Sequence, residues 1–142
     1  MLEDLRAALS QHRWSEGDTP PAVDFHLFFD GNTEEESIAP NGWGFGRPPL
    51  AEMYERFRQI AARPDVERVL VTLHYEWNDP DYADTFPPGD NVLIFSSAKP
   101  DVVEGWLDGL ETDGVIAGWP RGKPKNAPEP GAGVRIHCVC WD

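Results

Sequence analysis

The sequence predicts an α+β domain with a ferredoxin-like split βαβ sandwich, in which two helices cover one face of a four-stranded antiparallel sheet. Two observations favour this fold. After a first helix, apolar residues recur with periods typical of strand, helix, strand, strand, helix and strand, in that order. The length of 142 residues suits one domain, so we expect a single domain over residues 1–142 with an extra N-terminal helix.

The first half of the chain predicts two helices separated by a strand. Leucines at helical spacing predict a helix within residues 1–14, and apolar residues at alternate positions of 23–29 favour a half-buried strand. Residues 48–64 carry one apolar face at helical spacing and end at a proline, which predicts the longest helix. Because the two main helices cover one sheet face, we expect the first helix on the other face or at a sheet edge, near Phe28 or Trp141.

The second half predicts three strands and one helix. Residues 66–77 and 91–98 read as strands, and Pro100 suits the first position of a helix. Residues 118–133 form a loop rich in proline and glycine, and residues 134–141 read as the closing strand.

Composition narrows the possible partners. The formal net charge is −13, from 25 acidic and 12 basic residues. A surface for nucleic acid or for an anionic membrane needs cationic side chains, so we expect neither partner and favour a basic protein. The N-terminal residues show no apolar segment of the kind that directs secretion. Cys138 and Cys140 would lie too far apart along a strand for an unstrained disulfide bridge. We therefore expect a cytoplasmic protein with reduced cysteines.

Two acidic loops are predicted to form the binding site. In a ferredoxin-like fold the first and second strands run parallel, so the loops that follow them lie at the same rim of the sheet. Acidic side chains would attract a basic partner and exposed aromatic side chains would anchor it. The predicted partner-binding residues are Asp30, Asn32, Glu34, Glu35, Glu36, Trp43, Phe45, Trp77, Asp79 and Asp81.

Other kinds of site find weaker support. The acidic loop fails the calcium-loop pattern, because Glu35 stands where glycine is needed and Asn41 where glutamate is needed. Residues 41–48 lack the glycine spacing and the lysine of a phosphate-binding loop. His26 and His137 would lie on neighbouring strands of the predicted sheet, so they are the remaining metal candidates. We expect no metal and no cofactor.

Three segments carry a resemblance: "FFDGNTEEESIAPN", "PDVERVLVTLHYEW" and "GWPRGKPKNAPEPGAGVRIHCVCWD". They look like a group of small, acidic, uncharacterised bacterial proteins that resemble the immunity proteins of bacterial toxin systems. The resemblance implies a small cytosolic α+β protein that neutralises a toxin by binding it.

The preferred function is therefore a non-catalytic inhibitor of a basic toxin, or of another basic protein. The alternative is a small hydrolase or metal-dependent enzyme that uses His26, His137 and nearby carboxylates. The protein would be a monomer or a homodimer, and the homodimer would form through an open face of the sheet.

Overall fold

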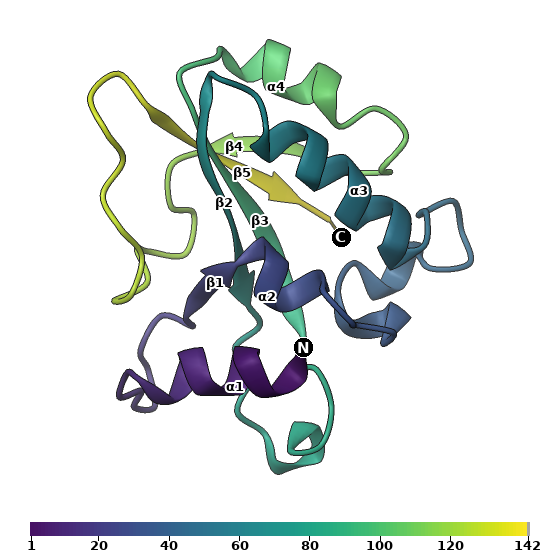
Figure 1. The fold of residues 1–142 in the computed structure, drawn as a ribbon, viewed down its shortest axis with the longest axis vertical. Coiled ribbons are helices and arrows are strands. Elements are labelled where there is room, and N and C mark those ends of the chain that lie inside the picture. The colour runs from purple at the N-terminus through teal and green to yellow at the C-terminus, as the bar shows by residue number, and fades with distance from the viewer. Residues whose placement is uncertain (142) are drawn as a thin grey trace.

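The computed structural model describes residues 1–141 and shows a mixed α+β fold (Figure 1). Within these residues five strands form one antiparallel sheet in the order β1-β2-β3-β5-β4. The strands are β1 (Ala22–Asp24), β2 (Val66–Leu73), β3 (Gly89–Ser96), β4 (Gly114–Ala117) and β5 (Arg135–Cys140). The helices are α1 (Leu2–Ser10), α2 (Phe25–Phe29), α3 (Leu50–Ala61) and α4 (Pro100–Trp106), with short 3-10 turns at Glu35–Ser37, Pro40–Gly42 and Pro80–Tyr82.

The α+β class is confirmed, but the sheet differs from the ferredoxin-like one. It has a fifth strand, β4, which pairs antiparallel with β5 at the end of the sheet. The sequence of β4 is a short apolar run between Gly114 and Gly118. Its strand structure depends on pairing with β5, which begins 21 residues after Gly114. The local sequence pattern gives no information about a pairing partner so far along the chain.

The predicted strand over residues 23–29 is largely wrong. Only Ala22–Asp24 is a strand, and it pairs antiparallel with β2, Asp24 lying opposite Leu70. The Asp24 carboxylate then accepts a hydrogen bond from the His26 N–H at 2.9 Å and caps helix α2. Phe25, Phe28 and Phe29 fit the helical spacing i, i+3, i+4 as well as they fit a strand, and all three are buried.

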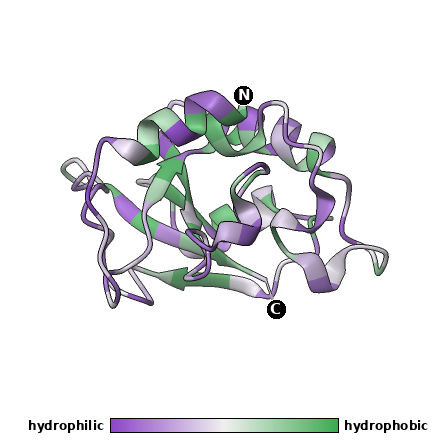
Figure 2. Cartoon of the chain, turned by 90° about the horizontal axis from the view of Figure 1, so that it is seen from below, coloured by the Kyte–Doolittle hydropathy of each residue, from purple (hydrophilic) through white to green (hydrophobic). Residues whose placement is uncertain are grey.

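The main core lies between one face of the sheet and the four helices. Hydrophobic residues run along the strands and the inner sides of the helices, while polar residues cover the outside (Figure 2). Leu5 of α1, Phe57 of α3 and Val103 of α4 all reach this core and are fully buried. Helix α1 therefore shares the side of the other helices; it contacts α2, which carries Phe28, and the edge strand β1. The expected edge placement is correct, and placement on the opposite face is not.

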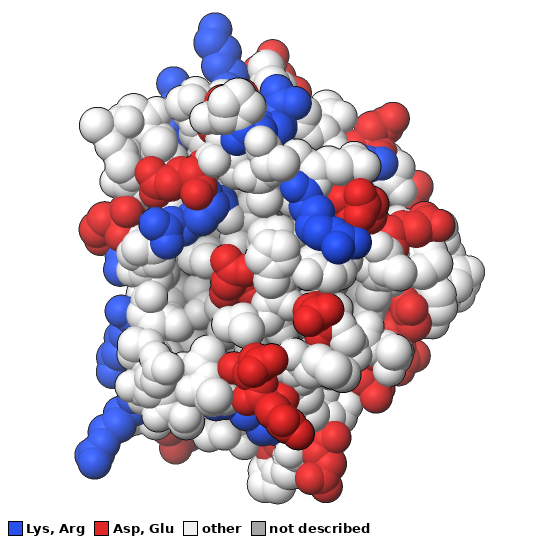
Figure 3. Space-filling model, in the orientation of Figure 1, with Lys and Arg blue, Asp and Glu red and all other residues white. Residues whose placement is uncertain are grey.

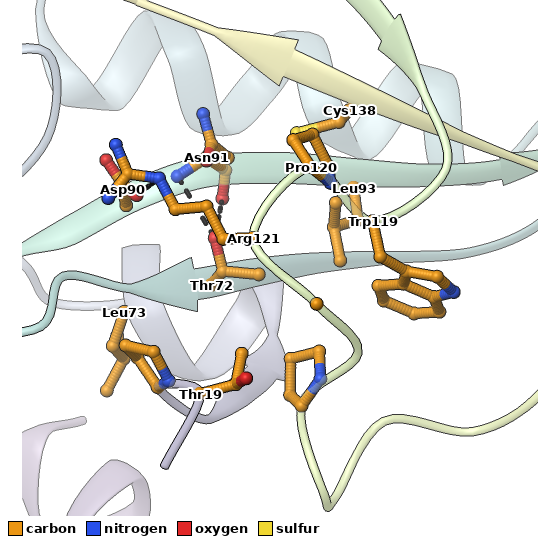
Figure 4. A pocket seen from close by; sticks show the side chains of 13 residues that line it. Thr19, Thr72, Leu73, Asp90, Asn91, Leu93, Trp119, Pro120, Arg121 and Cys138 are labelled. Carbon is orange, nitrogen blue, oxygen red and sulfur yellow. Dashed lines mark hydrogen bonds and ion pairs between the residues drawn. The ribbon is translucent and has the colours of Figure 1, made fainter. Parts of the chain in front are cut away.

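The opposite face of the sheet is covered by the proline- and glycine-rich segment after β4. Ala127 and Trp119 of this segment pack on Leu93, Phe95 and Cys138, and the rings of Phe95 and Trp119 meet edge to face. Beneath the segment lies a small pocket with a volume of about 30 Å³, lined by Leu93, Trp119 and Cys138 among others (Figure 4). The homodimer alternative assumed that this face of the sheet is open, but residues 118–133 cover the part of it around Leu93, Phe95 and Cys138.

Candidate functional site: an acidic depression between two clamped loops

The loop of residues 30–48, which follows α2, is organised around a buried arginine. The Arg47 side chain has no exposed surface. Its guanidinium donates to the carbonyls of Glu35, Ile38 and Pro48 and to the Glu35 carboxylate, and it lies 4.6 Å from the centre of the Trp43 ring. The same carboxylate accepts from the Leu50 N–H at 3.0 Å, which caps the start of α3. One ion pair thus fixes both the loop and the helix that follows it.

Asn32 holds the other end of this loop. Its side chain is buried and donates to the Phe28 carbonyl and the Ser37 hydroxyl, both at 3.0 Å. Its amide oxygen accepts from the Glu34 N–H at 2.9 Å. With their backbone fixed in this way, Glu34 and Glu36 are exposed on the outside of the loop.

The second loop, residues 74–88 between β2 and β3, is held by an arginine of α1. The Arg6 guanidinium donates to the carbonyls of Tyr82 and Thr85. From His74 to Asp90 the sequence contains five acidic residues and neither lysine nor arginine. Asp79 accepts from the Asp81 N–H at 2.9 Å, which starts a short 3-10 turn, and both carboxylates are exposed. This loop is therefore also ordered and acidic.

The two loops meet in a depression of about 320 Å³, which we call the acidic depression. Glu36, Pro40 and Asn41 come from the first loop, and His74, Glu76 and Tyr82 from the second. Asp90 of β3 and Trp141 complete the lining. In the orientation of Figure 3, acidic side chains gather over the lower and right parts of the surface, and basic side chains lie mostly toward its left and upper margins.

The two acidic loops lie side by side for a different reason from the predicted one. The prediction that the first and second strands run parallel is wrong, because β1 and β2 are antiparallel. Helix α2 brings the chain back instead, and its Phe28 ring packs against Gly89, at the end of the second loop. A Cβ on Gly89 would lie 2.9 Å from this ring, so the close approach depends on glycine.

The structure separates the predicted partner-binding residues into three groups. Glu34, Glu36, Asp79 and Asp81 are exposed and form no ion pair within residues 1–141. Asn32 and Glu35 are engaged inside the first loop, and Asp30 lies 4.0 Å from the terminal amine of Met1.

The third group is the aromatic residues, which do not form one cluster. Phe45, at the tip of the first loop, is 84% exposed and stands between two glycines with positive φ. Trp43 stacks on Arg47, and Trp77 packs edge to face on Trp14. Phe45 is thus the most exposed of the three candidate anchors.

The predicted partner-binding residues leave out several that line the depression, among them Glu76, Asp90 and Trp141, although Glu76 and Asp90 belong to the predicted acidic rim. The run of acidic residues from 74 to 90 without a basic residue was the available signal for the first two. Trp141 reaches the depression because its indole N–H donates to the Leu110 carbonyl at 3.1 Å, a contact that follows only from the position of β5.

The prediction that His26 and His137 lie on neighbouring strands is wrong, because His26 belongs to helix α2 and His137 to β5. Helix α2 exposes His26, whose Nδ1 is 2.8 Å from the Tyr54 hydroxyl. His137 is buried on β5, and β2 and β3 separate this strand from β1. Its Nε2 lies 3.3 Å from the Ser96 carbonyl. It pairs with Ile94, whose side chain belongs to the main core, so His137 faces the helices rather than the opposite face. Within the described chain, no three histidine, cysteine or acidic side chains group as metal ligands.

The cysteines carry no reactive thiol. Both are free, with their sulfur atoms 3.9 Å apart. Burial raises the pKa of Cys138 far above the ordinary range and raises the pKa of Cys140 as well. Both thiols are therefore protonated at neutral pH, which is unfavourable for nucleophilic chemistry.

Fold and site together define a small α+β protein with two clamped acidic loops around a shallow depression. The chain belongs to the uncharacterised YfbO family, whose model matches residues 2–139. Neither curated proteins nor solved structures gave a match. Among residues 1–141, no helix combines the length and the apolar character needed to cross a membrane.

Proposed function

We propose that this is a non-catalytic binding protein and that the acidic depression, its acidic surroundings and Phe45 receive a basic protein partner. The observation that carries the proposal is the fixing of two acidic loops by Arg47 and Arg6. Both arginines bind loop carbonyls, and Arg47 also binds Glu35, so within residues 1–141 neither forms an ion pair with Glu34, Glu36, Asp79 or Asp81. Of the acids that line the depression, Asp90 pairs with Arg121 at 3.4 Å.

The cost of this arrangement supports a binding role. Like charges on two neighbouring loops repel each other, and solubility alone would be served as well by acids spread over the surface. Loops that are already ordered lose less conformational entropy when a partner binds. Their acidic side chains accelerate encounter with a cationic surface, and an exposed aromatic ring slows dissociation once it enters a pocket.

The partner we favour is a basic toxin, which would make the protein a cytoplasmic immunity-type inhibitor. A small acidic α+β protein suits this role because inhibition requires only that it cover the toxin's basic active surface. Another basic protein would use the same surface, and capture from the source cells decides between these partners.

The experiment compares two variants that change the net charge equally. In the loop variant four acids become lysine: Glu34, Glu36, Asp79 and Asp81. In the control variant four acids outside the two loops become lysine: Glu16, Glu52, Glu104 and Asp108. The partner is captured with the parent protein by cross-linking, and association rates are then measured over a range of salt concentrations.

The loop variant should associate about tenfold more slowly than the parent at low salt, and the control variant should lose much less. Phe45→Ala should instead raise the dissociation rate and leave association nearly unchanged. If the loop and control variants slow association equally, only net charge matters and the acidic depression is not the binding site.

A further inference from the structure

The two edges of the sheet are finished differently. At the β1 edge the Asn126 side chain accepts from the Ala22 N–H at 3.0 Å and donates to the Ala22 carbonyl. These two bonds satisfy the backbone groups of Ala22 that another strand would otherwise pair with, so this edge is blocked. The other edge is β4, and none of its backbone groups receives such a side chain within residues 1–141.

The register shows which groups of β4 face outward. Gly118 donates to the Ile136 carbonyl at 3.0 Å, and Ile116 lies opposite Cys138. Hydrogen-bonded and non-hydrogen-bonded pairs alternate along an antiparallel ladder. The N–H and C=O groups of Val115 and Ala117 therefore point away from β5, and among the described residues they have no partner.

This edge lacks the usual protection against pairing. Free sheet edges are normally blocked by charged residues, proline, bulges or a covering segment. The strand β4 reads Gly-Val-Ile-Ala and contains no charged residue. Ile116 is 50% exposed and Ala117 is also exposed.

We propose that β4 pairs antiparallel with β4 of a second copy, about a two-fold axis at Ile116. In this register Val115 faces Ala117 of the second copy, and the outward groups form four hydrogen bonds across the interface. The two Ile116 residues form the non-hydrogen-bonded pair on the axis, with Cα atoms about 4.5 Å apart, so their exposed side chains cover each other. The two sheets become one.

The register favours a second copy over an unrelated strand. The outward groups of Val115 and Ala117 lie symmetrically on either side of Ile116, so a second copy supplies a donor and an acceptor for each of them. It also covers the exposed Ile116 with an identical apolar side chain.

The first test is sedimentation equilibrium of the whole chain over a wide range of protein concentration. The parent should pass from the mass of one chain to that of two as concentration rises. Ala117→Pro removes one outward N–H per copy, and proline is accepted at such edge positions. Ile116→Lys places two like charges on the axis. Each change should weaken dimerisation about tenfold or more, whereas Tyr75→Lys, which charges an exposed aromatic residue of the loop after β2, should not.

The second test fixes the register. In a background in which Cys138 and Cys140 are alanine, Ile116→Cys should cross-link two chains on mild oxidation, because the two thiols meet on the axis. Ala117→Cys is the matched control, since its thiols are offset along the strands and should cross-link far more slowly. A parent that remains a monomer at every concentration overturns the proposal. Equal cross-linking of the two variants overturns it also.

Discussion

Replacing Arg47 by methionine tests how the first acidic loop is built. The change keeps most of the side-chain volume but removes the charge and every donor. The Glu35 and Ile38 carbonyls then lose their partner, which costs roughly 1–3 kcal/mol for each buried group left unsatisfied. The Glu35 carboxylate is 30% exposed and can turn to water, which limits its own contribution. We therefore expect a loss of about 3–5 kcal/mol in the free energy of unfolding.

The chain provides a matched control in Arg58. This residue also pairs with a carboxylate, Glu55 at 2.8 Å, and also stacks on an aromatic ring, Tyr54 at 4.4 Å, but its side chain is 50% exposed. Because water replaces an exposed ion pair at little cost, Arg58→Met should lose no more than about 1 kcal/mol. The pair of variants therefore isolates the effect of burial.

The assay is urea unfolding followed by tryptophan fluorescence, with hydrogen exchange of the Leu50 amide as a local probe. This amide donates to the Glu35 carboxylate, so its protection should fall in Arg47→Met and stay unchanged in Arg58→Met. If the two variants lose the same stability, or if the Leu50 amide stays protected, Arg47 does not organise the loop.

Three further predictions concern stability elsewhere. Gly89→Ala places a Cβ 2.9 Å from the buried ring of Phe28 and should lower the free energy of unfolding by about 1–3 kcal/mol. Gly105→Ala in α4 meets open space and should raise it by about 0.5–1 kcal/mol. Chemical denaturation measures both changes. Burial lowers the pKa of His137 in the folded protein. As pH falls, the imidazole is therefore protonated in the unfolded chain at a higher pH than in the folded one. Stability should then fall as pH decreases below about 6.5, by at most about 1.4 kcal/mol per pH unit, and His137→Leu should remove this slope. Asn126→Ala leaves the Ala22 backbone unpaired and should cost about 1–3 kcal/mol in the same assay.

The sequence predicted those elements whose apolar pattern has a single reading. The predicted helix forms over residues 50–61. The strand predicted over residues 66–77 forms over 66–73 and ends four residues early, at Leu73. Residues 25–29 satisfy both periods at once, so the aspartate cap at position 24 decided the outcome in favour of a helix. The strand 114–117 depends on its pairing with β5 and had no local signal strong enough to predict it.

The candidate site was predicted in composition but not in geometry. A run of acids along the sequence shows where negative charge lies, yet Asn32 and Glu35 look the same in sequence whether they point outward or inward. The role of Glu35 follows from its contacts with the buried Arg47, which span 12 residues. The role of Asn32 follows from its bonds to the Phe28 carbonyl and the Ser37 hydroxyl. Loop interiors of this kind have no periodicity from which they can be predicted.

The position of the two clamping arginines connects the fold with the proposed function. A buried ion pair is rarely more stabilising than apolar residues of the same volume, so stability alone gives no reason to bury Arg47. The chain has 12 basic residues against 25 acidic ones. Two of the basic residues, Arg47 and Arg6, bind carbonyls of the two acidic loops. There they fix the backbone through loop carbonyls and Glu35, and within residues 1–141 neither forms an ion pair with Glu34, Glu36, Asp79 or Asp81. A protein that needed only to offset its acids would place the same cations outside, among them. Clamping the loops from within keeps the outer surface both rigid and negative, and these are the two properties that a surface for a basic partner requires.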